Sequence, residues 1–138
     1  MTESMDTLLD RVEEWMRHDL DDADVEELTR LVGFATADEG VRHPTALGEL
    51  RDRFAGTLQF GTAGLRGAMA AGPNRMNRSV VVAAAAGLGA YLTDVLGPGS
   101  GPRVVVGYDA RHRSQDFARD TAAVLTAAGA EVLLLPGP

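Results

Sequence analysis

The sequence contains neither cysteine nor lysine, and all thirteen basic residues of the 138-residue chain are arginines. Without cysteine there is no disulfide and no thiolate nucleophile, which fits a reducing cytoplasm. Without lysine there is no lysine general base. The first ten residues lack the basic and apolar segments of a secretory signal peptide. The longest apolar stretch, residues 80–90, is mostly alanine and glycine. We therefore expect no run long enough to span a membrane, and a cytoplasmic location.

Acidic residues outnumber arginines, but unevenly along the chain. The formal net charge is −7. Residues 1–58 contain fifteen acidic residues and six arginines, a charge of −9, whereas residues 59–138 contain five and seven, a charge of +2. The acidic first part argues against nucleic acid as a partner, and the second part is more favourable to an anion.

The first 57 residues have the apolar spacing of helices. Thr7 or Asp10 can cap a first helix, and Thr45 a third. We interpret the apolar positions as core packing of a helical amino-terminal extension, residues 1–57. Three stripes define these helices: Leu8, Val12, Trp15 and Met16; Val25, Leu28, Leu31 and Val32; and Leu47, Leu50 and Phe54.

Residues 58–138 have an α/β pattern. A short strand is predicted at 58–60, before a glycine-rich turn. A long helix is predicted after Asn77, and the glycines and prolines of residues 97–102 end it.

A strand–helix–strand unit follows. The apolar runs 104–108 and 132–135 predict buried strands, and the helix between them has Ser114 as its cap and Gly129 after its end. Two strands joined by such a helix form a parallel βαβ unit. Its ligand-facing end is expected at residues 109–113, after the first strand.

The glycine-rich turn, residues 60–67, has the sequence FGTAGLRG. Its glycines allow backbone amides to approach an anion, and Arg66 adds a planar fork that matches phosphate oxygens. A tight structural turn with a solvated arginine explains the same spacing, and spacing alone leaves both interpretations open.

Two further stretches combine glycine with arginine. Residues 72–78, GPNRMNR, bring Arg75 and Arg78 to a helix start, where we favour a structural loop over an anion site.

Residues 107–114, GYDARHRS, lie at the end of the predicted strand. We favour an Asp109–Arg111 pair that orders the loop, with Ser114 as a cap, and we leave Arg111 open as a ligand contact.

These three stretches, in this order, resemble the α-D-phosphohexomutase family, whose members include phosphoglucomutases and phosphomannomutases. FGTAGLRG followed by GPNRMN, after a helical extension, is similar to the branch with phosphoglucomutase and phosphopentomutase members. The resemblance is good over residues 45–138 and weak over the first forty. It implies four domains around a cleft, the first a mixed sheet with helices on both faces. The expected fold is therefore α/β, with a helical extension before a truncated domain I at 58–138.

By this resemblance, Arg66 matches the family arginine that contacts the phosphate at the catalytic centre. Thr62 lies in the same active-site loop, and Arg111 is a further candidate for phosphate binding.

The chain also departs from the family pattern. Nothing in it matches the phosphoserine loop of Thr-Ala-Ser-His-Asn-Pro type, the Asp-Gly-Asp magnesium loop, the sugar-specificity loop or the fourth domain. We therefore expect no catalytic nucleophile and no metal ligand in this chain. An amino-terminal fragment or a disrupted reading frame is the favoured interpretation. The strand at 132–135 is then expected to lack cover for its apolar side chains.

In an intact parent, the resemblance implies a magnesium-dependent isomerase. It would move a phosphate reversibly between the 1- and 6-positions of a hexose, or the 1- and 5-positions of a pentose. Phosphoserine and a sugar bisphosphate are the implied intermediates, and the bisphosphate is also the activator. The expected partner is a phosphosugar, with no nucleic acid or membrane, and this chain alone is expected to be inactive. The preferred sugar and the oligomeric state are left open. The alternative is a stand-alone, non-catalytic α/β module that binds a phosphometabolite or a protein.

Overall fold

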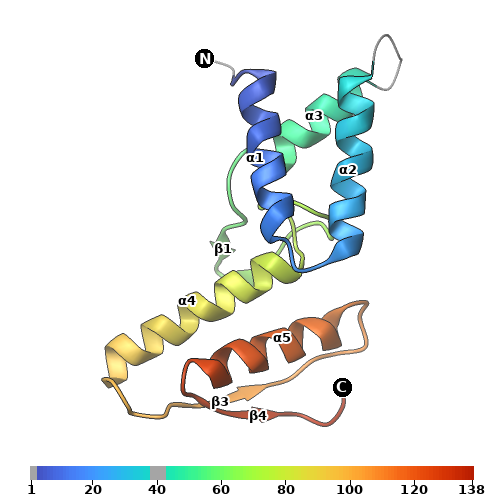
Figure 1. Ribbon diagram of the computed structural model, residues 1–138. Helices are drawn as coiled ribbons and strands as arrows, with labels where there is room; N and C mark the ends of the chain where they lie inside the picture. The colour runs from blue at the N-terminus through green and yellow to red at the C-terminus, as the bar shows by residue number, and fades with distance from the viewer. Residues whose placement is uncertain (1–2, 38–42) are drawn as a thin grey trace. The chain divides into compact units, whose positions relative to one another are not determined.

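The computed structural model describes residues 3–37 and 43–138 and divides into two compact units, with the boundary between Ser79 and Val80. The first contains three helices and a short hairpin, and the second contains a long helix and a strand–helix–strand unit (Figure 1).

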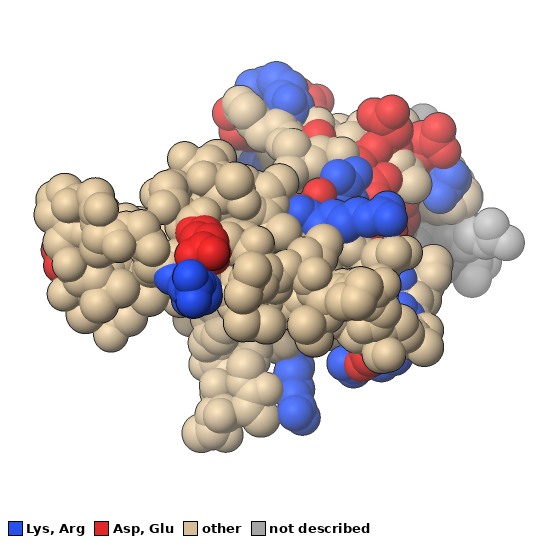
Figure 2. Space-filling view, turned by 90° about the horizontal axis from the view of Figure 1, so that it is seen from below, with Lys and Arg blue, Asp and Glu red and all other residues tan. Residues whose placement is uncertain are grey.

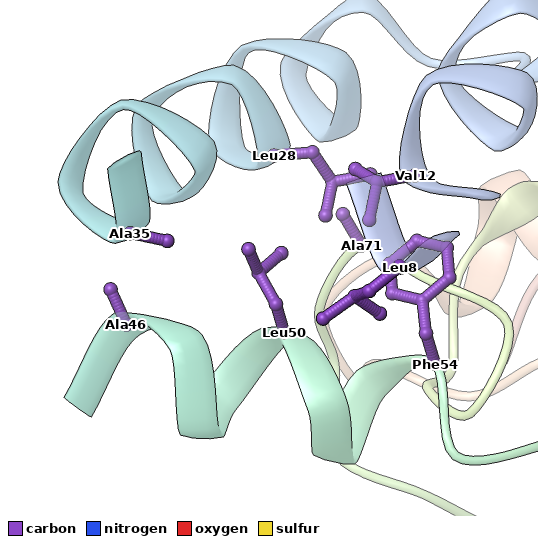
Figure 3. Close-up of a cluster of buried hydrophobic side chains, with 8 residues drawn as sticks. All are labelled: Leu8, Val12, Leu28, Ala35, Ala46, Leu50, Phe54 and Ala71. Atoms are coloured by element: carbon purple, nitrogen blue, oxygen red, sulfur yellow. The ribbon is translucent and has the colours of Figure 1, made fainter. Parts of the chain in front are cut away.

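The first unit is built on helices α1 (Met5–His18), α2 (Asp22–Thr36) and α3 (His43–Arg53). Their apolar stripes meet in one core, as the spacing predicted. Figure 3 shows side chains from all three helices pointing toward one another. The buried members are Leu8, Val12, Leu28, Ala35, Ala46, Leu50, Phe54 and Ala71.

The caps predicted for α1 and α3 were wrong. The Ser4 hydroxyl accepts a hydrogen bond from the Thr7 amide at 3.2 Å, so α1 begins before Thr7 and Asp10. Helix α3 begins at His43, so Thr45 lies inside it. An apolar stripe marks the face that a helix buries, whereas a polar residue outside that stripe sets where the helix begins.

An aromatic contact joins the ends of α1 and α3. The rings of Trp15 and Phe54 meet edge to face, with centroids 6.5 Å apart and an interplanar angle of 89°. The Trp15 indole donates to Asp19 Oδ2 at 2.7 Å, so its polar atom is satisfied at the edge of the core.

A short antiparallel hairpin of β1 (Phe60–Gly61) and β2 (Gly64–Leu65) follows α3. The predicted strand at 58–60 therefore begins later than expected. The reason is that the Leu58 amide donates to the Pro73 carbonyl at 2.9 Å, in a loop contact outside the hairpin.

The second unit confirms the predicted βαβ topology. Strand β3 (Arg103–Val106), helix α5 (Ser114–Ala127) and strand β4 (Glu131–Leu134) follow one another, and the two strands pair in parallel. Helix α5 lies along this strand pair (Figure 1). The crossover length requires the helix, because parallel strands cannot be joined by a tight turn.

Helix α5 ends as predicted but begins differently. Gly129, at φ 90°, donates to the Thr126 carbonyl, and Ala130 donates to the Leu125 carbonyl, which is the Schellman pattern. At the start, the predicted Ser114 cap was wrong, because Ser114 is the first helical residue. Arg113 precedes it at φ 63° and makes no side-chain cap.

The β3–β4 sheet has one covered face. Helix α5 packs against both strands, and a helix can cover only one side of a sheet. Val105 is 61% exposed and Leu133 is 46% exposed, whereas Val104 and Val106 are half-buried. In the last strand Leu133 and Leu134 are exposed and Val132 is half-buried, so a strand predicted to be buried is only partly covered.

Helix α4 (Arg78–Leu96) corrects one expectation from the sequence. It has 19 residues, and an 18-residue window within it has a mean hydropathy of 1.7, so by length and composition alone it is long and apolar enough to cross a bilayer. Within the second unit, Gly89 of this helix lies close to the end of α5, since a β-carbon on Gly89 would be 3.1 Å from Ala128 Cβ. Gly87 has no such neighbour, so only one of the two glycines serves close packing.

Candidate functional site

The three glycine–arginine stretches are divided between the two units. The hairpin and the loop before α4 belong to the first unit, and the loop after β3 belongs to the second.

The hairpin turn gets its shape from glycine. Phe60 pairs with Leu65 and Gly61 with Gly64, which leaves Thr62 and Ala63 as a two-residue loop. Neither loop residue has a positive φ, whereas Gly64 has φ 90°. A residue with positive φ directly after such a turn favours glycine, because other residues rarely adopt that conformation.

Arg66 follows β2 directly and is exposed. Its guanidinium makes no hydrogen bond or ion pair with any residue that the structure describes. Thr62, at the tip of the hairpin, is also exposed, and its hydroxyl has no partner in the same described ranges. A permanently charged fork on a short hairpin is thus available to bind an anion.

Arg75, in contrast, is held by acidic side chains. It pairs with Asp52 and lies 3.6 Å from Glu49, and its side chain is only 12% exposed. Arg78 donates to the Leu20 carbonyl at 3.4 Å. These contacts confirm the structural interpretation of the 72–78 stretch.

An ion cluster that the sequence analysis did not predict surrounds the buried residue Arg53. Its Nη1 lies 2.6 Å from Glu27 Oε1, and its Nε lies 2.9 Å from Glu49 Oε1. Burial by itself lowers the pKa of Arg53, but hydrogen bonds to Glu49 and Glu27 outweigh it and raise the pKa above the ordinary value. The Glu49–Arg53 spacing of four residues was a usable signal, whereas Glu27 comes from another helix.

The loop after β3 is ordered by the predicted pair. Asp109 Oδ2 accepts from Arg111 Nε at 2.8 Å, and Oδ1 accepts from the Arg111 backbone amide at 3.0 Å. The backbone hydrogen bond is the main cause that lowers the pKa of Asp109. Ser114 Oγ accepts from the Asp109 amide at 3.2 Å. Arg111 is therefore exposed but already paired.

Arginines and acidic side chains lie next to each other on the face shown in Figure 2, among a larger uncharged surface. Within residues 3–37 and 43–138, no three His, Asp or Glu side chains gather as they would around a metal ion. The described residues therefore do not fit the magnesium site that the resemblance implies for a parent enzyme.

Comparison with known proteins identifies the domain. Residues 57–136 match the family description "phosphoglucomutase/phosphomannomutase, alpha/beta/alpha domain I". The chain is 37% identical over 125 residues to the phosphoribomutase of Saccharomyces cerevisiae, a match that covers 91% of this chain and 18% of that protein. It is 35% identical over 129 residues to a probable phosphoribomutase of Schizosaccharomyces pombe, covering 91% of this chain and 20% of the relative.

A shorter match joins the chain to phosphoglucomutases. The phosphoglucomutase of Staphylococcus haemolyticus is 42% identical over 77 residues, which is 56% of this chain and 14% of that protein. The chain thus spans no more than about a fifth of the length of these relatives. No solved structure matches it significantly.

The match includes the whole of α4, so this apolar helix lies within an α/β/α domain. It also includes the Arg66 hairpin, the loop before α4 and the βαβ unit. The chain therefore belongs to the phosphoglucomutase/phosphomannomutase family, and its residues 57–136 match domain I of that family.

Proposed function

We propose that this chain supplies the phosphate-binding arginine of a phosphosugar mutase. The observation that carries the proposal is the state of Arg66, which is exposed and unpaired among the described residues while Arg53 and Arg75 are held by acids. Arg66 lies in the family domain, and its guanidinium can bind two oxygens of one phosphate.

The reaction proposed for a complete enzyme is an intramolecular phosphate transfer. A phosphoserine gives its phosphoryl group to a free hydroxyl of the sugar phosphate, which makes a bisphosphate and a free serine. The serine then accepts the other phosphoryl group from the bisphosphate, and the isomeric monophosphate leaves. Phosphoryl transfer depends on positioning and on stabilisation of charge, and a permanently protonated arginine supplies both throughout the cycle.

The described residues support a role in phosphate binding but give no basis for assigning a metal-dependent step to this chain. They carry no cluster that fits magnesium, so we assign no step to a metal here. Thr62 is proposed as a second donor on the same hairpin. Arg111 is a weaker candidate, because Asp109 already engages it. The names of the relatives support both a pentose phosphate and a hexose phosphate as substrate.

The proposal is tested by an NMR titration of this chain with inorganic phosphate and with glucose 1,6-bisphosphate. We expect the Arg66 side-chain Nε–H signal and the amides of Gly64 and Gly67 to shift together. Arg66→Lys keeps the charge but loses the fork, so we expect affinity to fall about tenfold, equivalent to one charge-assisted hydrogen bond.

Arg51 provides the matched control, because it is also exposed and has no partner among the described residues. Arg51→Lys should leave the affinity unchanged. Equal losses in the two variants, or an unmodified chain whose hairpin signals do not respond to either ligand, would contradict the proposal.

A further inference from the structure

Ala71 is held at both of its backbone polar groups. Its amide donates to Glu27 Oε2 at 3.2 Å, and its carbonyl accepts from Arg53 Nη1 at 3.2 Å. The same Nη1 lies 2.6 Å from Glu27 Oε1, and Ala71 is completely buried. Arg53 and Glu27, from two different helices, therefore clamp one residue of the loop that precedes α4.

The loop of residues 70–77, here called the anchored loop, also packs on the backbone of Arg53. The Arg53 carbonyl accepts from the Asn74 amide at 3.0 Å. Gly72 has φ 111°, and a β-carbon on it would lie 3.2 Å from Arg53 Cβ. Glycine is required there by both the conformation and the close approach. Arg53 thus contacts the anchored loop with its guanidinium and its carbonyl, and its β-carbon lies too close to Gly72 for a side chain there.

The anchored loop in turn holds both ends of the Arg66 hairpin, residues 60–66. The Leu58 amide, just before the hairpin, donates to the Pro73 carbonyl at 2.9 Å. The Met76 amide donates to the carbonyl of Ala68, just after the hairpin, also at 2.9 Å. The hairpin itself is exposed from residue 60 to residue 64, so these flanking contacts fix its orientation.

The charges of the cluster are satisfied internally. Arg53 is 8% exposed and has a carboxylate on each side, Glu27 and Glu49. A buried cation with both partners in place holds its geometry closely, and loss of one partner leaves an uncompensated buried charge. The cluster is therefore suited to hold the loop.

We propose that Arg53 is a positioning residue for Arg66: it clamps the anchored loop to helices α2 and α3, and the loop fixes the hairpin that presents Arg66. The inference rests on the proposed function, because it takes the hairpin as the phosphate-binding element. It also gives the helices before the family domain a role, since Glu27 and Arg53 precede residue 57, where the family match begins.

The test uses the full 138-residue chain with two variants, Arg53→Lys and Glu27→Gln. Lysine cannot reach Glu27, Glu49 and the Ala71 carbonyl at once, and glutamine removes one charge while it keeps the shape. Matched controls are Arg51→Lys and Glu26→Gln, the exposed neighbours on the same helices. Two quantities are measured: amide hydrogen exchange at Leu58, Ala71 and Met76, and the affinity for inorganic phosphate.

We expect exchange at these three amides to accelerate about tenfold in both variants, with exchange in the interior of α1 unchanged, since local openings are separable from global unfolding. Phosphate affinity should fall about fivefold although Arg66 is intact, as misplacement of a binding group predicts. Neither Arg51→Lys nor Glu26→Gln should change the exchange rates of these amides or the phosphate affinity. A merely structural Arg53 would lower the melting temperature without changing phosphate affinity in the folded chain, and that result would overturn the proposal.

Two further results, unfolding of the variants and a lack of phosphate binding, can be distinguished from failure of the clamp. If both variants unfold, hydrogen exchange of the unmodified chain is measured in low concentrations of urea. The clamp predicts that the amides of Leu58, Ala71 and Met76 open together, with the same dependence of their exchange rates on urea. Different urea dependences of these three rates would refute the clamp. If the unmodified chain shows no phosphate response, the proposed function fails, while the exchange data still report whether Arg53 holds the hairpin.

Discussion

The side chain of Leu58 fills the space in which a β-carbon of residue 67 would lie. An ideal Cβ on Gly67 would be 2.7 Å from Leu58 Cδ1. Gly67 directly follows Arg66, so this packing sits beside the proposed phosphate-binding side chain. Gly64 has a different role, because its φ of 90° forms the turn and its Cβ position is open.

Gly67→Ala should therefore force Leu58 to rotate away. Because the clash involves the end of a side chain, we expect the free energy of unfolding to fall by only about 1 kcal/mol, the lower end for overpacking. Gly56→Ala is the control, since a β-carbon there meets no atom within 4 Å. Urea denaturation measures both, and a Gly67→Ala chain as stable as the Gly56→Ala chain would show that Leu58 does not pack there.

This chain alone should show no mutase turnover. Three of its four serines have structural contacts: Ser4 caps α1, Ser79 donates to Asp19, and Ser114 accepts from the Asp109 amide. The sequence also contains no match to the family's phosphoserine loop, so we predict that a phosphate bound at Arg66 is not passed on. A coupled assay with glucose 1-phosphate, glucose 1,6-bisphosphate and magnesium measures turnover. Mutase turnover that copurifies with the chain and is lost in the Arg66→Ala variant would contradict this prediction.

The carboxyl of Asp109 should titrate below the ordinary range for aspartate, because the Arg111 backbone amide and, after it, the Arg111 side chain stabilise the charged form. Since the folded-state pKa lies below the unfolded one, the interaction stabilises the fold at higher pH and is lost as the pH falls through the folded-state pKa. Arg111→Ala should raise the pKa of Asp109 only part of the way, because alanine keeps the amide.

Carbon-13 NMR of the Asp109 carboxyl follows this titration. Arg119→Ala is the control, because Arg119 is exposed on α5 and has no partner among the described residues. An unchanged Asp109 pKa in Arg111→Ala would mean that the side-chain pair does not persist in solution.

The bare sheet face should make the chain bind apolar dyes and self-associate, because parallel sheets normally have both faces covered. Replacing Val105 and Leu133 together by threonine should reduce dye binding and light scattering. The free energy of unfolding should change by less than about 0.5 kcal/mol per site, since both side chains are exposed. Leu125→Ala is the contrast: this side chain is fully buried, and its truncation should cost about 2–5 kcal/mol. A monodisperse chain that binds no dye would contradict the prediction.

The periodicity of apolar residues predicted the helices and the βαβ unit, because each element buries one face and the residues of that face are close together in the sequence. It placed helix starts less well. Ser4 lies outside the apolar stripe of α1, and a helix start depends on one side-chain hydrogen bond. The left-handed Arg113 before α5 had no signal at all, since arginine rarely takes that conformation.

The sequence by itself determined where glycine must bend the chain, which segments form strands and helices, and which family the domain resembles. Only the tertiary structure decided that Arg53 is held by acidic side chains while Arg66 makes no such contact among the described residues. Arg53 and Arg66 are chemically identical. One partner of Arg53, Glu49, lies four residues before it, but the other, Glu27, lies 26 residues away on another helix. Burial and ion pairing depend on which elements meet in space, and that meeting is what leaves Arg66 exposed on its hairpin.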